Sequence, residues 1–181
     1  MSRARLFGAA LTCLSALAPE RLHAEPQGHV AARVAPCGVD EDGGFWQDTR
    51  FCTGLTADLL FLRERNSDFG LGPYVEVSTA GFWDARYGGG VSLLAPVSED
   101  FPLVVSLGAY GHETRALALG GSLFFGMRSY NFHGNYNLTL GLFGSVTRDL
   151  GASDSLLTAL GVEIDGFLIA APFLLAFEAL R

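Results

Sequence analysis

The chain has 181 residues, enough for one domain of ordinary size, and a formal net charge of −7, and all twelve of its basic residues are arginine. With 49% hydrophobic and 17% charged residues, it is too apolar for a disordered tail. The arginines form no basic patch, which excludes the electrostatic footprint of nucleic-acid binding, so we expect no nucleic-acid partner.

The first 24 residues have the organisation of a secretory signal peptide. The short positive region MSRAR precedes the apolar run LFGAALTCLSALA, which is too short to span a bilayer. The small residue Ala24 stands before Glu25 and predicts cleavage between them. Cleavage there removes three Arg and one Glu, so the net charge changes from −7 to −9. A lipoprotein modified at Cys13 is the minor alternative, because Thr12 is a poor residue to precede such a cysteine.

Residues 25–52 contain Pro, Gly and acidic residues but no sustained period, which predicts an irregular N-terminal segment. Export implies an oxidising compartment, and Cys37 and Cys52 are the two cysteines left after cleavage. Such a pair predicts a disulfide, which would close a loop of about 15 residues and contribute about 3 kcal/mol. A metal or redox pair is the weaker alternative, because the sequence has neither a CxxC motif nor a His at ligand spacing. We expect no metal and no cofactor.

From Thr53 onward, apolar runs of about ten residues alternate with short polar breaks, a spacing typical of a meander of strands. Seven breaks, the last of them DGFLIAAP, divide this part into eight segments. The eighth segment is expected to begin near Ile169 or Pro172. Since no segment holds 18 uninterrupted apolar residues, we expect no transmembrane helix.

Three of these segments alternate between two unlike faces, as a period of two residues requires of a strand. In the run 138–147, Leu and Val occupy one face, while Thr, Ser, Gly and Phe143 occupy the other. The runs 103–112 and 156–165 alternate in the same way. Their second faces carry, among others, Tyr110, His112, Glu163 and Asp165.

The composition of the second face predicts where it points. Its Gly, Ser, Thr, Tyr and isolated acids rarely cover a water-exposed surface, but they fit the interior of a narrow barrel. The first face, made of Leu, Val, Ala and Phe, suits hydrocarbon, and strands of about 9 to 11 residues cross a bilayer when tilted. The pattern therefore predicts an all-β fold, a closed antiparallel up-and-down membrane barrel of about eight strands over residues 53–181.

The signal peptide, the eight segments and the aromatic-rich breaks together resemble the small eight-stranded outer-membrane barrels of Gram-negative bacteria. The stretches GPYVEVSTAGF and FFGMRSYNFHGNYNLTLGLF look like parts of uncharacterised proteins of this kind. The resemblance implies the bacterial outer membrane as location. It implies membrane lipids, lipopolysaccharide and the outer-membrane assembly machinery as partners. Such barrels often end on an aromatic residue that this machinery recognises, whereas the present chain ends PFLLAFEALR.

The interior face collects ionisable side chains, which are costly inside a narrow barrel unless they are paired. We therefore predict a structural lumen network centred on Arg128 with Glu76 and Asp165, with Arg86 and Arg148 as further partners near the turns. The predicted lumen residues are Asp58, Glu76, His112, Arg128, Glu163, Asp165 and Glu178. Glycines in YGGGVS are expected to let the wall bend or to make room for bulky lumen groups.

The polar stretch RSYNFHGNY, residues 128–136, is predicted to be a rim and a turn. Tyr130, Phe132 and Tyr136 stand where aromatic residues anchor a barrel at the membrane interface. Gly134 in HGN suits a turn, since glycine adopts positive φ freely. A ligand site in this stretch is the alternative.

The predicted function is a structural or interaction role in the cell envelope, without catalysis. Side chains fill the interior of an eight-stranded barrel, so we expect no general porin. One alternative is a lipid A-modifying hydrolase or acyltransferase, which needs a His near a Ser on the lipid-facing surface and an acid to orient the His. Neither His112 nor His133 shows that pattern. The other alternative is a soluble, exported, lipocalin-like barrel that binds an apolar ligand.

Overall fold

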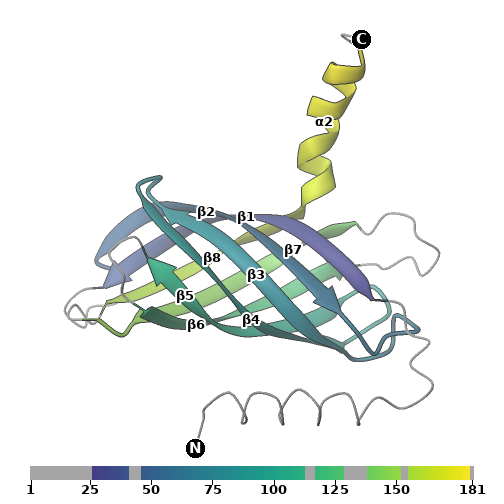
Figure 1. Ribbon diagram of the computed structural model, residues 1–181, viewed down its shortest axis with the longest axis horizontal. Coiled ribbons are helices and arrows are strands. Elements are labelled where there is room, and N and C mark those ends of the chain that lie inside the picture. Colours follow the sequence, from purple (N-terminus) through teal and green to yellow (C-terminus); the bar gives the residue numbers. More distant parts are fainter. Residues whose placement is uncertain (1–25, 41–45, 113–116, 129–137, 152–154, 180–181) are drawn as a thin grey trace, which may run out of the picture.

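The computed structural model of the chain describes residues 26–40, 46–112, 117–128, 138–151 and 155–179. In these ranges the chain forms eight β-strands followed by the helix α2 at Gly166–Ala179 (Figure 1). The strands, in chain order, are β1 (Gln27–Asp40), β2 (Asp48–Leu60), β3 (Gly70–Ala80), β4 (Asp84–Pro96), β5 (Pro102–His112), β6 (Leu117–Arg128), β7 (Thr139–Asp149) and β8 (Leu156–Asp165).

The eight strands close into a barrel. Each strand pairs antiparallel with the next one in sequence, and β8 returns to pair antiparallel with β1. A closed sheet has no edge strand, so each strand has a hydrogen-bonding neighbour on both sides. The predicted closed, antiparallel, up-and-down barrel of eight strands is therefore confirmed.

The barrel has a terminal end, where the strand part of the chain begins and ends, and an opposite, distal end. At the terminal end, β1 begins at Gln27 and β8 ends at Asp165. At the distal end, β1 ends at Asp40 and β8 begins at Leu156. Because neighbouring strands run in opposite directions, the connections alternate between these ends, and the turn 81–83 between β3 and β4 lies at the distal end.

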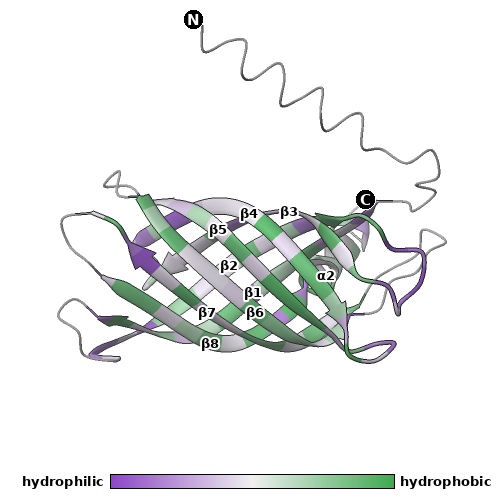
Figure 2. Cartoon of the chain, turned by 90° about the horizontal axis from the view of Figure 1, so that it is seen from below, coloured by the Kyte–Doolittle hydropathy of each residue, from purple (hydrophilic) through white to green (hydrophobic). Residues whose placement is uncertain are grey.

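Burial alternates along the strands as their sequence alternates. In β7, Leu142 and Val146 are exposed on the outer surface, whereas Phe143 and Thr147 are buried inside. The runs in β5 and β8 follow the same rule, with Tyr110 and Glu163 buried inside. Figure 2 shows hydrophobic and more polar residues following one another along the strands. The predicted two-faced strands are confirmed, and their apolar face points outward.

The prediction of an irregular segment at residues 25–52 is wrong. Gln27–Asp40 forms β1, which pairs with both β2 and β8, and β2 already begins at Asp48. The segment keeps a period of two, since Val30 and Val34 are exposed outside while Arg33 is buried inside. Pro36 is tolerated because proline removes only one ladder donor, and the β1–β8 ladder is interrupted there.

The expected last strand near Ile169 or Pro172 is also wrong, because these residues belong to α2. The sequence GFLIAAPFLLAFEA is uniformly apolar and lacks the alternation of a strand with unlike faces. The barrel is moreover closed without it, since β1 already pairs with β8. Within the described residues, no helix combines the length and the apolar character needed to span a membrane.

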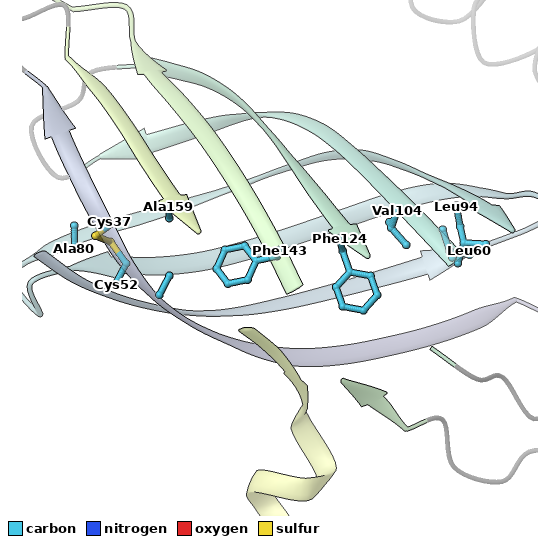
Figure 3. Packing of buried hydrophobic residues seen from close by; sticks show 10 residues of the cluster. Cys37, Cys52, Leu60, Ala80, Leu94, Val104, Phe124, Phe143 and Ala159 are labelled. Atoms are coloured by element: carbon cyan, nitrogen blue, oxygen red, sulfur yellow. A yellow bond between two sulfur atoms is a disulfide. The ribbon is translucent and has the colours of Figure 1, made fainter. Parts of the chain in front are cut away.

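The predicted disulfide between Cys37 and Cys52 is present in the structure. It joins β1 to β2 inside the barrel, with the two Cα atoms 5.8 Å apart. Figure 3 shows this bond beside Ala80 and Ala159, within a cluster of buried apolar side chains. A second group inside the barrel consists of Leu60, Leu94, Val104 and Phe124 (Figure 3). Both groups belong to one cluster of buried apolar side chains.

Candidate functional site in the barrel lumen

The central lumen cluster is built around Arg33 of β1. Its Nε donates to Glu163 Oε2 at 2.7 Å, and its Nη1 donates to Glu76 Oε2 at 2.8 Å. The guanidinium carbon lies 5.0 Å from the ring centroid of Phe143, a cation–π distance. All four side chains lie within the barrel, so one arginine connects β1 with β3, β7 and β8 across the lumen.

Two lumen-facing tyrosines lie beside this cluster. The hydroxyls of Tyr74 in β3 and Tyr110 in β5 are hydrogen-bonded at 2.8 Å, and both residues are buried. Their rings lie where neighbouring strands carry glycine. A Cβ on Gly108 would stand 2.5 Å from the Tyr74 hydroxyl, and one on Gly88 would stand 2.6 Å from the Tyr110 ring. Gly88, in the run YGGGVS, therefore makes room for a bulky lumen group, as predicted.

A second ionic cluster lies near the terminal end. Arg128 Nη2 of β6 donates to both carboxylate oxygens of Asp58 in β2, at 2.5 and 2.7 Å. His29 of β1 adds its Nδ1 at 3.6 Å from Asp58 Oδ2, and its Nε2 is hydrogen-bonded to Thr139 Oγ1 at 2.7 Å. All four side chains are buried. The cluster ties together β1, β2, β6 and β7.

A third cluster occupies the distal mouth. Arg86 of β4 donates to both carboxylate oxygens of Asp149, each at 3.3 Å, and to Asp84 at 3.4 Å. Asp84 also forms an ion pair with His112. Ser155 donates its hydroxyl hydrogen to Asp149 Oδ2 at 2.5 Å. The His112 side chain is 21% exposed, so this cluster, unlike the central one, reaches water.

The lumen face predicted from parity is largely confirmed, while the predicted pairing is not. Six predicted residues, namely Asp58, Glu76, His112, Arg128, Glu163 and Asp165, lie on the lumen side of their strands. Glu76 is paired with Arg33, whereas Arg128 is paired with Asp58. Arg86 does pair near a turn, as expected, whereas Arg148 is exposed on the other side of β7.

Two further predictions have different outcomes. Glu178 is not a lumen residue, because it lies on α2, where it is exposed. The predicted aromatic rim of Tyr130, Phe132 and Tyr136 lies outside the described residues, so it stays a prediction.

Sequence reasoning missed Arg33, His29 and Asp149. Arg33 and His29 lie in the segment that was expected to be irregular, although one signal was present. From residue 29 to 34, His, Ala and Arg alternate with Val, Ala and Val, which is the period of a strand with one apolar face. Asp149 stands at the end of β7, where a boundary residue is easily assigned to the turn.

The outer surface carries a broad apolar band. Its centre consists of exposed Leu and Val side chains from all eight strands, among them Val34, Leu55, Val77, Val91, Leu107, Leu119, Leu142 and Leu160. Exposed aromatic residues flank this band toward both ends. Toward the distal end they are Phe51, Phe82, Trp83 and Tyr87. Toward the terminal end they are Phe61, Phe69, Phe101 and Phe125.

The central part of the described lumen holds little free space. A cavity of about 30 Å³ is lined by residues that include Arg33, Glu76, Arg86 and Tyr110. This volume suits water and is too small for an organic ligand. Among the described side chains, no three His, Cys, Asp or Glu are grouped as metal ligands would be. Each of the three ionic clusters joins at least two strands that are not neighbours in the wall.

Comparison with known proteins gives one likeness of fold. No protein-family model matches the chain, and no curated protein matches it. Among solved structures, the chain is similar to the outer membrane protein Ail of Yersinia pestis, whose backbone structure was determined in a phospholipid bilayer nanodisc. The two are 16% identical with a TM-score of 0.41, over 76% of this chain and 99% of that one. At this level of similarity, no function passes from that protein to this chain.

Proposed function

We propose that the chain is a bacterial outer-membrane β-barrel with a structural or interaction role in the cell envelope. The observation that carries the proposal is the inverted polarity of the barrel. Arginines and carboxylates are paired inside, while Leu and Val cover the outside between two groups of exposed aromatic residues. A transmembrane barrel has this arrangement, with aromatic girdles at both interfaces.

Physical arguments favour a lipid environment over water. Soluble monomers rarely expose large contiguous apolar patches, whereas this barrel exposes leucines and valines from all eight strands. Closure satisfies the backbone hydrogen bonds of the wall, which hydrocarbon requires. The strands contain 10 to 14 residues, enough to cross a tilted path through a bilayer. The lipocalin-like alternative requires the opposite polarity, with an apolar chamber inside and a polar surface outside.

The braced lumen supports a role without transport through the barrel. Arg33 bridges two carboxylates across the centre, and the Tyr74–Tyr110 pair lies beside it. A solute passing through the lumen would have to break several buried hydrogen bonds, each costly to leave unmade. We propose membrane lipids and lipopolysaccharide as contacts of the outer surface, and the outer-membrane assembly machinery as the partner during insertion.

Fractionation and gel mobility test the proposal. The full chain is expressed in a Gram-negative host, the outer membrane is isolated, and samples are run on SDS gels unheated and boiled. The protein is also refolded with and without detergent micelles. We expect it in the outer-membrane fraction, with an unheated band that migrates faster and forms only with detergent. A monodisperse, β-rich protein without detergent would contradict the proposal and favour the soluble barrel.

As a second candidate function we propose modification of lipid A at the distal end. The observation that favours it is the ion pair of His112 with Asp84 at the partly exposed distal mouth, since a carboxylate that orients an imidazole is one part of a hydrolytic site. His112 lies on the lumen side of β5, so this candidate requires the substrate to reach it through the mouth and not from the lipid-facing wall. The test is a mass spectrum of lipid A from cells that express the chain or its His112→Ala variant. A new lipid A species lost in the variant supports the candidate, and identical spectra count against it.

A further inference from the structure

The helix α2 differs from the strands in having no polar side. Its sequence, GFLIAAPFLLAFEA, contains one charged residue, Glu178, next to its last position. The side chains of Leu168, Ile169, Leu175 and Phe177 are all exposed. At 100° per residue these four positions are spread around the helix, and Leu175 and Phe177 lie on nearly opposite sides. Exposed apolar side chains therefore lie on more than one side of the helix.

The place where α2 leaves the barrel lies within the outer apolar band. The last residue of β8, Asp165, is the register partner of Ala31, and the helix begins at the next residue without a loop. Gly166 lies against Val30, whose side chain is exposed on the outer surface. On the other side of β8, Leu140 is the register partner of Ile164 and is exposed as well. The helix thus starts beside apolar side chains of the band.

The direction and length of α2 fit a helix that lies along the membrane plane and does not cross the membrane. The helix stands away from the wall, across the long direction of the barrel (Figure 1). With 14 residues it is about 21 Å long, shorter than the roughly 30 Å of a hydrocarbon core. If the barrel spans a membrane, a helix in this direction runs along the membrane plane.

Pro172 adds a constraint on depth. Within a helix, proline cannot donate the hydrogen bond that the carbonyl four residues earlier would accept, here that of Leu168. An unpaired carbonyl is costly in the middle of hydrocarbon, but water and head groups satisfy it near the interface. This favours the boundary of the leaflet over its centre.

We propose that α2 is an in-plane membrane helix that lies in the leaflet at the terminal end of the barrel, with lipid acyl chains as its partner. The inference rests on the proposed membrane location of the barrel. Lipid is favoured over a protein groove because a helix bound in a groove needs one apolar stripe and keeps a polar face, whereas α2 is apolar all round. The helix enlarges the lipid-facing surface of the protein on one side only.

Spin labels on opposite sides of the helix test this placement. The sequence has three cysteines, and Cys37 and Cys52 are joined, so the Cys13→Ser background leaves no free thiol. Leu175→Cys and Phe177→Cys are made separately in the full chain, labelled and reconstituted in phosphatidylcholine–phosphatidylglycerol vesicles. For each label, accessibility to oxygen, which concentrates in hydrocarbon, is compared with accessibility to a nickel chelate, which stays in water.

Two control positions calibrate the measurement. Leu107→Cys lies in the middle of β5 on the apolar band, and Glu99→Cys lies in the exposed connection between β4 and β5 at the terminal end. We expect both α2 labels to have an oxygen-to-nickel ratio several-fold above that of Glu99→Cys. The ratio at Leu107→Cys should be at least as high.

Other outcomes overturn the inference in distinguishable ways. Nickel-accessible labels on α2 together with an oxygen-accessible Leu107→Cys place the helix in water, while the proposed barrel location stands. If only one of the two α2 labels is accessible to oxygen, that side of the helix faces lipid and the other packs on protein, such as a second copy of the chain. Immobilised labels whose spectra are broadened by spin–spin coupling indicate the same packing. A nickel-accessible Leu107→Cys removes the membrane location itself, and with it the basis of the inference.

Discussion

Arg33 is the residue on which the balance of charge in the centre of the lumen depends. It is buried, and its guanidinium contacts two carboxylates that are also buried, Glu76 and Glu163. Replacing a whole buried ion pair by apolar residues is often neutral or even stabilising, whereas removing one partner leaves an uncompensated buried charge. Here the loss of one cation leaves two carboxylates without their arginine partner. Substitution of Arg33 should therefore lower the stability by more than the loss of its packing alone.

We predict that Arg33→Met lowers the free energy of unfolding by about 3–5 kcal/mol. Arg50→Met serves as the matched control, because Arg50 pairs with Asp48 at the exposed distal rim and should cost about 0–1 kcal/mol. The measurement is urea unfolding in detergent micelles, followed by circular dichroism. Adding Glu76→Gln and Glu163→Gln to Arg33→Met should recover much of the loss. An equal loss of stability in the two arginine variants would contradict the role of Arg33 as a link between strands.

Gly108 is the second residue with a specific steric role. An added methyl group would stand 2.5 Å from both the Tyr74 hydroxyl and the carbonyl oxygen of Gly89. We predict that Gly108→Ala costs about 1–3 kcal/mol, in the range of overpacked cores. Gly144→Ala is the control, since its methyl group would meet Leu160 at 3.8 Å, an ordinary contact. The unheated gel band gives the readout as its melting temperature, and a similar shift for both variants would exclude a special role of Gly108.

At the level of elements, the sequence predicts strands well where one face is apolar and the other is not. The alternation in β5, β7 and β8 identified which side chains face the lumen, because a period of two leaves no choice once one face is assigned. It failed for β1, where Pro36, Cys37 and Gly38 resemble a loop. It also failed for α2, where a uniformly apolar run has no period to distinguish helix from strand.

The pairing inside the lumen could not be predicted from local pattern. Parity tells on which side of the wall a residue lies, but a partner across the lumen must also lie at the same height. Height depends on the stagger of all intervening strands, which no single segment encodes. Arg128 and Asp58 illustrate this, since they belong to β6 and β2 and lie 70 residues apart in sequence.

The disulfide is the covalent link between the first two strands. Cys37→Ala combined with Cys52→Ala should lower the free energy of unfolding by about 2–4 kcal/mol, because the unfolded chain regains the freedom of the closed loop. The barrel should still form, since β1 and β2 keep their full register. Reductant should destabilise the unsubstituted protein by a similar amount and leave the double variant unchanged. A double variant that remains sensitive to reductant would show that the effect lies elsewhere.

At the scale of the whole molecule, the inverted polarity makes a prediction that separates lipid from water. Leu107, which is 66% exposed, lies at the middle of β5. In a bilayer, Leu107→Arg should cost about 2–4 kcal/mol, as charged residues do on the lipid face near the midplane. Glu99→Arg, in an exposed connection, should stay within about 0.5 kcal/mol. Unfolding from lipid vesicles measures both, and a neutral Leu107→Arg would mean that water covers the wall.

The closure of the barrel has a consequence for how the chain reaches this state. Seven ladders of the described barrel join strands that are neighbours in sequence, whereas the ladder between β1 and β8 joins the first strand to the last. Its hydrogen bonds bring Ala31 beside Asp165, so this step closes a far longer stretch of chain than any hairpin does. The same ladder is interrupted at Pro36, so the pairing of β1 with β8 contributes less stabilisation than an unbroken ladder would. The rate at which the barrel is completed should therefore depend on this single seam far more than on any hairpin.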